Sequence, residues 1–160
     1  MDKLTKSFAT GISGTTFMTA SSALMSLIPH EQFQEPDQLF KLIGRLAPWL
    51  PKSYKKIASW GAHYTMGLLF AAAYVELWEK KKIEHSFKNG IILGILSGLL
   101  GMLIWKATFS IHPLPPNNRK SHFYLQRIPA HVVFAVFATL GYVKIVKIEC
   151  ADKKADLAKS

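Results

Sequence analysis

Apolar residues in this sequence gather into four long blocks, and the segments between them hold most of the charged residues. The four blocks cover residues 8–28, 60–78, 89–111 and 128–148. At the helical rise of about 1.5 Å per residue, blocks of about 20 residues reach across the roughly 30 Å of hydrocarbon in a bilayer. The pattern therefore predicts an all-α integral membrane four-helix bundle. Residues 1–149 would form this single domain, and residues 150–160 a charged cytoplasmic tail.

The third block is the clearest of the four, because residues 90–105 are apolar without a single charge and are interrupted only by small residues. Glycine weakens a helix in water by about 1 kcal/mol relative to alanine. In lipid, however, small residues allow a neighbouring helix to approach closely. We read the glycines of the first block in the same way. The predicted helix-packing residues are Gly11, Gly14, Gly90, Gly94, Gly98 and Gly101.

The first block is less apolar and is rich in Gly, Ala, Ser and Thr. It follows Lys3 and Lys6, so a cleaved signal peptide is one interpretation. Its apolar residues are spread over the whole block instead of forming a short leucine-rich core. We therefore expect a retained helix whose hydroxyl groups bond to its own backbone or to neighbouring helices.

The connection after the first block contains an amphipathic segment at residues 37–48. Leu39 and Ile43 share one helical face, and Lys41 and Arg45 lie on another. This spacing predicts a short helix lying in the membrane interface. A helix packed on the protein with its apolar face has the same pattern, so that alternative stays open.

The connection after the third block, residues 112–127, contains Pro113, Pro115 and Pro116, and we expect a loop there instead of a helix. Four crossings place both termini on one side of the membrane. That side carries slightly more of the 20 Lys and Arg residues than the other. By the positive-inside rule the termini are predicted to be cytoplasmic.

The net charge of +10 is sorted into the segments between the apolar blocks, where lysines and arginines would meet anionic lipid headgroups. A nucleic-acid duplex would need a continuous basic surface, so we expect no nucleic-acid partner. The single cysteine, Cys150, excludes an intrachain disulfide and a metal site made of cysteines alone.

Short matches relate the two halves of the chain. Residues 7–12 and 86–91 share Ser, Phe, Gly and Ile at equivalent positions. The same interval of about three helical turns separates two pairs of residues, His63 with Tyr74 and His131 with Tyr142. A duplicated two-helix hairpin would explain these matches, and chance is the alternative.

Four histidines fall at the extracytoplasmic ends of the predicted spans, namely His30, His63, His112 and His131. Histidines at one depth on neighbouring helices can sense or relay protons, and we add Tyr74, Tyr142 and Glu76 as candidates for the same role. A transition metal held by His63 and His131, or a haem, is a second interpretation. Plain interfacial histidines are a third. For Glu76, an ion pair with Lys80 one turn later is the simpler expectation.

Residues 60–143 resemble the YagU-like family of uncharacterised bacterial inner-membrane proteins. The resemblance rests on His63, the LLFAAAY segment that ends at Tyr74, the glycines of the third block, the Leu-Pro-Pro loop at 114–116, and Ala130 with His131. It implies a four-span protein of the bacterial inner membrane and carries no assigned chemistry or cofactor.

Motifs typical of enzymes are scarce in this sequence. It contains no Gly-x-Ser-x-Gly, no His-Glu-x-x-His and no Gly-rich phosphate loop. The acidic residues Glu31, Glu35 and Asp37 share the first connection, which we interpret as too peripheral for chemistry by paired carboxylates.

We therefore predict a small non-enzymatic membrane protein that acts as an accessory or oligomeric component, with histidines that sense or relay protons. The expected partners are the lipid bilayer and either further copies of the chain or another membrane protein. An electron-transfer or metal-handling subunit is the first alternative. An oligomeric transporter is the second, since one bundle packed on glycines leaves little lumen.

Overall fold

The computed structural model describes residues 1–27, 33–115 and 120–157, and these residues form five α-helices and no strand. The helices are α1 (Lys3–Leu27), α2 (Glu35–Leu46), α3 (Lys52–Glu79), α4 (Phe87–Ile111) and α5 (Lys120–Leu157). The predicted all-α class is confirmed for this part of the chain. By length and composition, α4 and residues 121–157 of α5 are able to cross a membrane, whereas α1 and α3 do not meet the same criterion.

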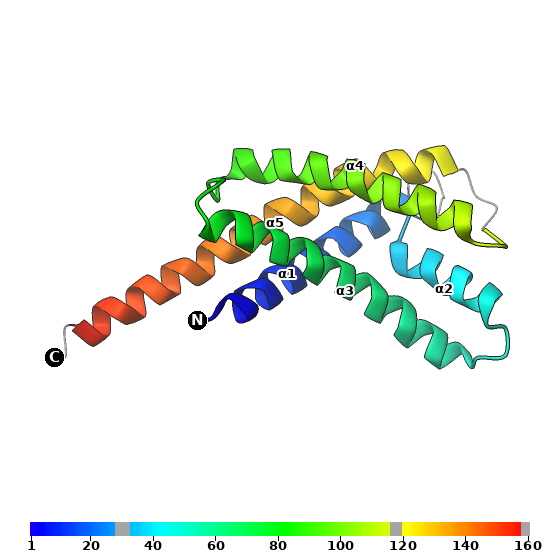
Figure 1. The fold of residues 1–160 in the computed structure, drawn as a ribbon, viewed down its shortest axis with the longest axis horizontal. Coiled ribbons are helices and arrows are strands. Elements are labelled where there is room, and N and C mark those ends of the chain that lie inside the picture. Colours follow the sequence, from blue (N-terminus) through cyan, green and yellow to red (C-terminus); the bar gives the residue numbers. More distant parts are fainter. Residues whose placement is uncertain (28–32, 116–119, 158–160) are drawn as a thin grey trace.

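The four long helices pack in the spatial order α3, α1, α5, α4. Helix α1 packs against both α3 and α5, and α5 packs against α4 on its other side. A short turn joins α3 to α4, yet these two helices make no extensive backbone contact. In Figure 1 they meet at that turn and diverge toward the end that holds α2. Side chains and not backbones therefore meet on the side between α3 and α4, which we call the open side of the bundle.

This order departs from the twofold relation that a duplicated hairpin predicts. Such a relation would make the α1–α5 contact equivalent to a contact between α3 and α4. The first contact is extensive and the second is not. The contacts within the two halves, α1 with α3 and α4 with α5, are both extensive, so only the packing between the halves departs from the twofold relation.

The beginning of α1, the end of α5 and the α3–α4 turn lie toward one end of the molecule, and α2 lies toward the other (Figure 1). Local sequence signals explain several helix boundaries. Pro36 occupies the first turn of α2, where a missing N–H costs nothing. The Ser86 hydroxyl accepts a hydrogen bond of 3.3 Å from the Asn89 N–H and caps α4.

Glycine makes the contact between α4 and α5 possible. A Cβ atom on Gly94 would lie 2.5 Å from the Val132 Cα, and one on Gly98 would lie 2.7 Å from the Ile128 Cα. Both distances are shorter than any real carbon contact, and the atoms in the way belong to the backbone of α5. Any side chain at these two positions would force the helices apart.

The other predicted packing glycines also lie in helix contacts. Gly90 faces Thr139, Gly101 faces His131, Gly11 faces Leu68 and Gly14 faces Phe134. A Cβ on Gly67 of α3 would come closer to a neighbouring side chain than one on any other glycine, and that side chain is the hydroxyl of Thr15 on α1.

Helix α5 begins at Lys120, so the prediction that residues 112–127 form a loop is wrong for 120–127. The helix also continues through Pro129 and ends only at Leu157. The three prolines of the connection all precede residue 117, so they do not interrupt the helix. Phe123 and Arg127 are almost completely buried, and this packing stabilises the added helical turns.

Helix α2 exists close to its predicted place, but a different face of it is buried. Glu35, Gln38 and Leu42 are buried, whereas Leu39 and Ile43, expected on the apolar face, are only partly buried. Packing of α2 against α3 therefore places a carboxylate inside the protein. The reason is tertiary, because the partner of this carboxylate comes from α5.

Candidate functional site

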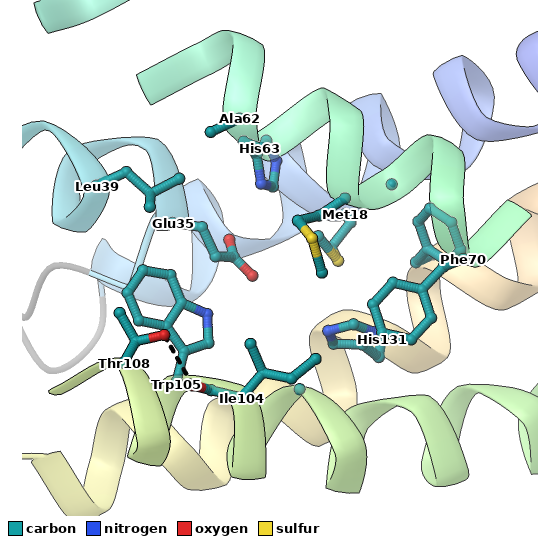
Figure 2. A pocket seen from close by; sticks show the side chains of 14 residues that line it. Met18, Glu35, Leu39, Ala62, His63, Phe70, Ile104, Trp105, Thr108 and His131 are labelled. Atoms are coloured by element: carbon teal, nitrogen blue, oxygen red, sulfur yellow. Dashed lines mark hydrogen bonds between the residues drawn. The ribbon is translucent and has the colours of Figure 1, made fainter. Parts of the chain in front are cut away.

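A cavity of about 210 Å³ lies between α3 and α4, on the open side of the bundle. Its apolar wall includes Met18, Met66, Phe70, Ile104, Trp105 and Phe134. Three titratable side chains complete it, and they come from three different helices: Glu35 of α2, His63 of α3 and His131 of α5. Figure 2 shows all three of these side chains directed toward the same space.

Glu35 forms a buried ion pair with Arg127. The Arg127 side chain is completely inaccessible and Glu35 is 4% exposed. The Arg127 Nε donates a hydrogen bond to the Phe123 carbonyl at 3.2 Å, and its Nη2 donates to the Phe33 carbonyl and to the Gln126 side chain. The guanidinium carbon also lies 4.2 Å from the centre of the Phe123 ring. A buried charge needs such partners, since an unpaired one is strongly destabilising.

Arg127 does not satisfy all of the Glu35 carboxylate. Beyond the ion pair, neither carboxylate oxygen has a hydrogen-bond partner among the described residues. The side chain points into the cavity (Figure 2). Burial acts to raise the pKa of Glu35, but the facing Arg127 guanidinium, helped by His63 and His131, holds that pKa below its usual range. Glu35 is therefore a carboxylate with an open acceptor position.

His63 is held by a hydrogen bond that fixes its tautomer. Its Nε2 lies 2.8 Å from the Thr19 hydroxyl, and that hydroxyl donates its only hydrogen to the Thr15 carbonyl at 2.7 Å. The Thr19 oxygen must therefore accept from His63, so the proton of the neutral ring lies on Nε2. The Nδ1 lone pair has no partner within the described part of the chain.

His131 is 6% exposed and makes no hydrogen bond to a described residue. Its ring contacts those of Phe70 and Phe134, with centroids 5.2 Å and 6.3 Å away. A Cβ on Gly101 would lie 2.7 Å from the His131 Nε2, so glycine at that position makes room for the imidazole. A buried imidazole without a partner is unusual, because an unmade hydrogen bond costs about 1–3 kcal/mol.

Of the other two predicted histidines the structure describes only His112, which does not line this cavity. His112 donates from Nε2 to the Leu42 carbonyl at 3.1 Å, and its Nδ1 accepts from the Leu114 N–H at 3.0 Å. Both ring nitrogens are used, and the side chain ties the end of α4 to α2. His30 lies outside the described residues. The structure thus brings His63 and His131 to one cavity and places His112 elsewhere.

The two predicted tyrosines have structural contacts. The Tyr74 hydroxyl lies 2.7 Å from the Ser97 hydroxyl and 3.2 Å from the Leu93 carbonyl, which joins α3 to α4. Tyr142 packs against Trp78, with ring centroids 4.7 Å apart. Neither tyrosine lines the cavity.

Glu76 lies on the same helix as His63 but toward its other end. It forms ion pairs with Lys3 and with Lys80, the latter at 2.5 Å, as the spacing along the helix predicts. The ion pair with Lys3 joins the beginning of α1 to the last turn of α3. Glu76 does not line the cavity.

Sequence reasoning missed Glu35 and Arg127. Both were assigned to loops, and Glu35 was interpreted as too peripheral for chemistry, although both are buried in the protein. Glu35 and Arg127 are far apart in the sequence, so no local pattern indicates that they pair and join α2 to α5. The one available signal was the position of Arg127 directly before an apolar block, where an unpaired charge would be costly.

The described residues contain no group of three or more His, Cys, Asp or Glu side chains arranged to hold a metal ion. No protein-family model, no curated protein and no solved structure matches this chain. The resemblance to the YagU-like family therefore stays a prediction.

Proposed function

We propose that this chain is a non-enzymatic integral membrane protein that takes up and releases protons at the cavity formed by Glu35, His63 and His131. One observation carries the proposal: two imidazoles and one carboxylate from three helices share one cavity, and the Glu35 carboxylate and the His131 Nδ1 have unused hydrogen-bonding positions. Groups arranged in this way exchange protons with one another or with water that enters the cavity.

The outer surface of α4 supports a membrane location. Its glycines face α5, while large apolar side chains are exposed, including Ile92, Leu96, Leu99, Leu100 and Leu103. Only 39% of the apolar window of α4 and 33% of that of α5 is buried. The core helix of a water-soluble protein would be mostly buried instead. An exposed apolar surface of this kind fits lipid or a second membrane protein.

We extend this location to all four long helices, because α1 packs against α5 and α3 packs against α1, so both would enter the bilayer with α5. The termini would then be cytoplasmic, as the distribution of lysine and arginine predicts, and the membrane would be the bacterial inner membrane, as the resemblance implies. The cavity would open near the extracytoplasmic side, where acidity outside the cell is sensed. The exposed apolar faces would bind further copies of the chain or a partner membrane protein.

Burial in the cavity disfavours a charged imidazole, and the neighbouring charges then determine how far a proton is stabilised there. A proton on either imidazole is favoured by the Glu35 carboxylate of α2 and opposed by Arg127 of α5. The two imidazoles also oppose each other once one of them is charged. Among the described residues, α1 and α4 contribute no titratable side chain to the wall. His63 and His131 should therefore titrate as a coupled pair.

Nuclear magnetic resonance of the ¹⁵N-labelled imidazoles, with the full chain in lipid nanodiscs, tests the proposal. We expect the His63 and His131 signals to titrate as the pH falls from 8 to 3, and His131→Gln to shift the titration of His63. His85→Gln, at an exposed position on the α3–α4 turn, is the matched control and should leave both titrations unchanged. Two signals that stay constant over this range, or that titrate independently, would contradict proton uptake at the cavity.

A further inference from the structure

We propose that the cavity between α3 and α4 binds a small apolar amine in its cationic form. The ammonium group would lie against Glu35 and His63, and the apolar body would lie among the aromatic side chains of the wall. This inference rests on the proposed function only in that both use the same three polar side chains. It names a ligand, which proton uptake alone does not require.

Hydrogen-bond acceptors predominate on the polar side of the cavity. The Glu35 carboxylate has an open acceptor position, and the neutral His63 ring has a free lone pair on Nδ1. The Thr108 hydroxyl donates to the Ile104 carbonyl at 2.8 Å, which leaves it able only to accept from a ligand. A ligand that satisfies these groups must supply several N–H donors, as an ammonium group does.

The apolar side of the cavity suits a cation that carries a hydrocarbon body. Phe70, Trp105 and Phe134 contribute aromatic rings, and Met18 and Met66 contribute flexible thioethers. The face of an aromatic ring attracts a cation by about 0.5–2 kcal/mol, most strongly where water is excluded. Methionine side chains adapt to ligands of different shape. The same wall therefore stabilises both parts of an aryl or branched alkyl amine.

The volume of the cavity limits the size of the ligand. A protein cavity of about 150 Å³ holds benzene. By the same proportion, the 210 Å³ here would hold roughly eight non-hydrogen atoms. Benzylamine has this size and is cationic at neutral pH. A haem or a lipid of ordinary length is far too large to enter as a whole.

An anionic ligand does not fit the charges of this site. Arg127 is the buried cation next to the cavity, and every nitrogen of its guanidinium already faces an acceptor within the protein. An anion would instead meet the open side of the Glu35 carboxylate. Two like charges in contact in a buried site repel each other strongly.

Binding of an ammonium group and protonation of the imidazoles should exclude each other, because both place positive charge at the same acceptors. We therefore expect amine binding to weaken as the pH falls and to release protons when the imidazoles are charged. Amine uptake and proton release would then be linked in one site.

The test measures binding of four compounds of similar size to the full chain in nanodiscs at pH 7.5, by the shifts they cause in the His63 and His131 signals. Benzylamine is the probe, benzyl alcohol is its neutral analogue, benzoate is the anion and toluene lacks a polar group. Titration of empty nanodiscs corrects for partition into lipid. We expect benzylamine to bind at least tenfold more tightly than the other three compounds.

Two variants locate the site. Glu35→Gln should remove the tenfold preference for benzylamine over benzyl alcohol. Because this variant leaves Arg127 without its partner and can fail to fold, Trp105→Leu provides a second test and should weaken benzylamine binding several-fold. Trp49→Leu, at a residue that is 79% exposed and outside the cavity, is the matched control and should leave the affinity unchanged.

Equal binding of benzyl alcohol or toluene, or a preference for benzoate, would overturn the inference. These outcomes are separate from those that test proton uptake. Imidazoles that titrate as a coupled pair without binding benzylamine would leave the proposed function intact. Benzylamine binding to imidazoles that never titrate would remove the proton function and keep the ligand site.

Discussion

The contact between α4 and α5 and the space between α3 and α4 are built from opposite kinds of residue. In the first, glycines let two backbones touch, so that Gly94 lies against the backbone at Val132. In the second, large side chains such as Phe70 and Trp105 stand between helices that are neighbours in sequence. Close packing between α4 and α5 leaves no space for a ligand or for water. The wider spacing in the other provides a cavity with polar groups in its wall.

The two regions are also maintained by different interactions. The α4–α5 contact depends on shape alone, because backbone atoms of one helix fill the space that a side chain would take on the other. The cavity depends on one ion pair, since Glu35 and Arg127 connect α2 to α5 beside it. Substitutions in the two regions should therefore destabilise the protein through different interactions.

Removal of Arg127 should produce the largest effect. Arg127→Met leaves the Glu35 carboxylate buried without its partner, so we expect a loss of about 3–5 kcal/mol in the free energy of unfolding. Titration with sodium dodecyl sulfate in mixed micelles would measure it. Combining Arg127→Met with Glu35→Leu should recover most of this loss, because no unpaired charge remains. Lys41→Met, at an exposed side chain, is the control and should change stability by less than about 0.5 kcal/mol.

A methyl group in the α4–α5 contact should produce the next largest effect. Gly94→Ala places a carbon atom against the backbone of α5 and should cost up to about 3 kcal/mol in the same measurement. Gly61→Ala is the matched control, because nothing lies within 4 Å of the added Cβ. It should be neutral or stabilising by about 0.5–1 kcal/mol through helix propensity. Equal effects of the two changes would mean that α4 and α5 are farther apart than described.

Acidification should act on the cavity region and spare the α4–α5 contact. The pKa of Glu35 is lowered in the folded protein, so its ion pair contributes stability above the unfolded value, near 4.5, and loses that contribution as the pH falls through the folded value. The stability difference between the native chain and Glu35→Gln should thus shrink below about pH 4.5. A difference that grows on acidification would mean that the folded pKa is raised instead.

Removal of the His63 hydrogen bond should produce the smallest change in stability and the most specific change in the spectrum. Thr19→Val removes the acceptor for the His63 Nε2–H and should cost about 1 kcal/mol. The ¹⁵N shifts of His63 should then report a mixture of tautomers where the native chain has one. Thr16→Val, which removes an exposed hydrogen bond to Tyr64, is the control and should leave the His63 shifts unchanged.

Local sequence patterns predicted the five helices and the small residues at their contacts, but placed the beginning of α3 at residue 60 instead of Lys52. The uncharged block at 90–105 and its glycines predicted helix α4, and residues 37–48 predicted α2 to within two residues at each end. The beginning of α5 was missed, because the prolines before residue 117 were taken to govern the whole connection. A helix boundary depends on burial as well as on proline, and burial of Phe123 was not visible in the sequence.

The sequence by itself determined the helical blocks and the small residues that allow backbones to touch, because apolar periodicity and the absence of a side chain act over a few neighbouring positions. Only the tertiary structure decided that Glu35 meets Arg127, and that His63 and His131 share a cavity while His112 does not. These pairs are distant in the chain, and the free energy that selects them comes from burying charge beside its partner. That term exists only once the helices have packed.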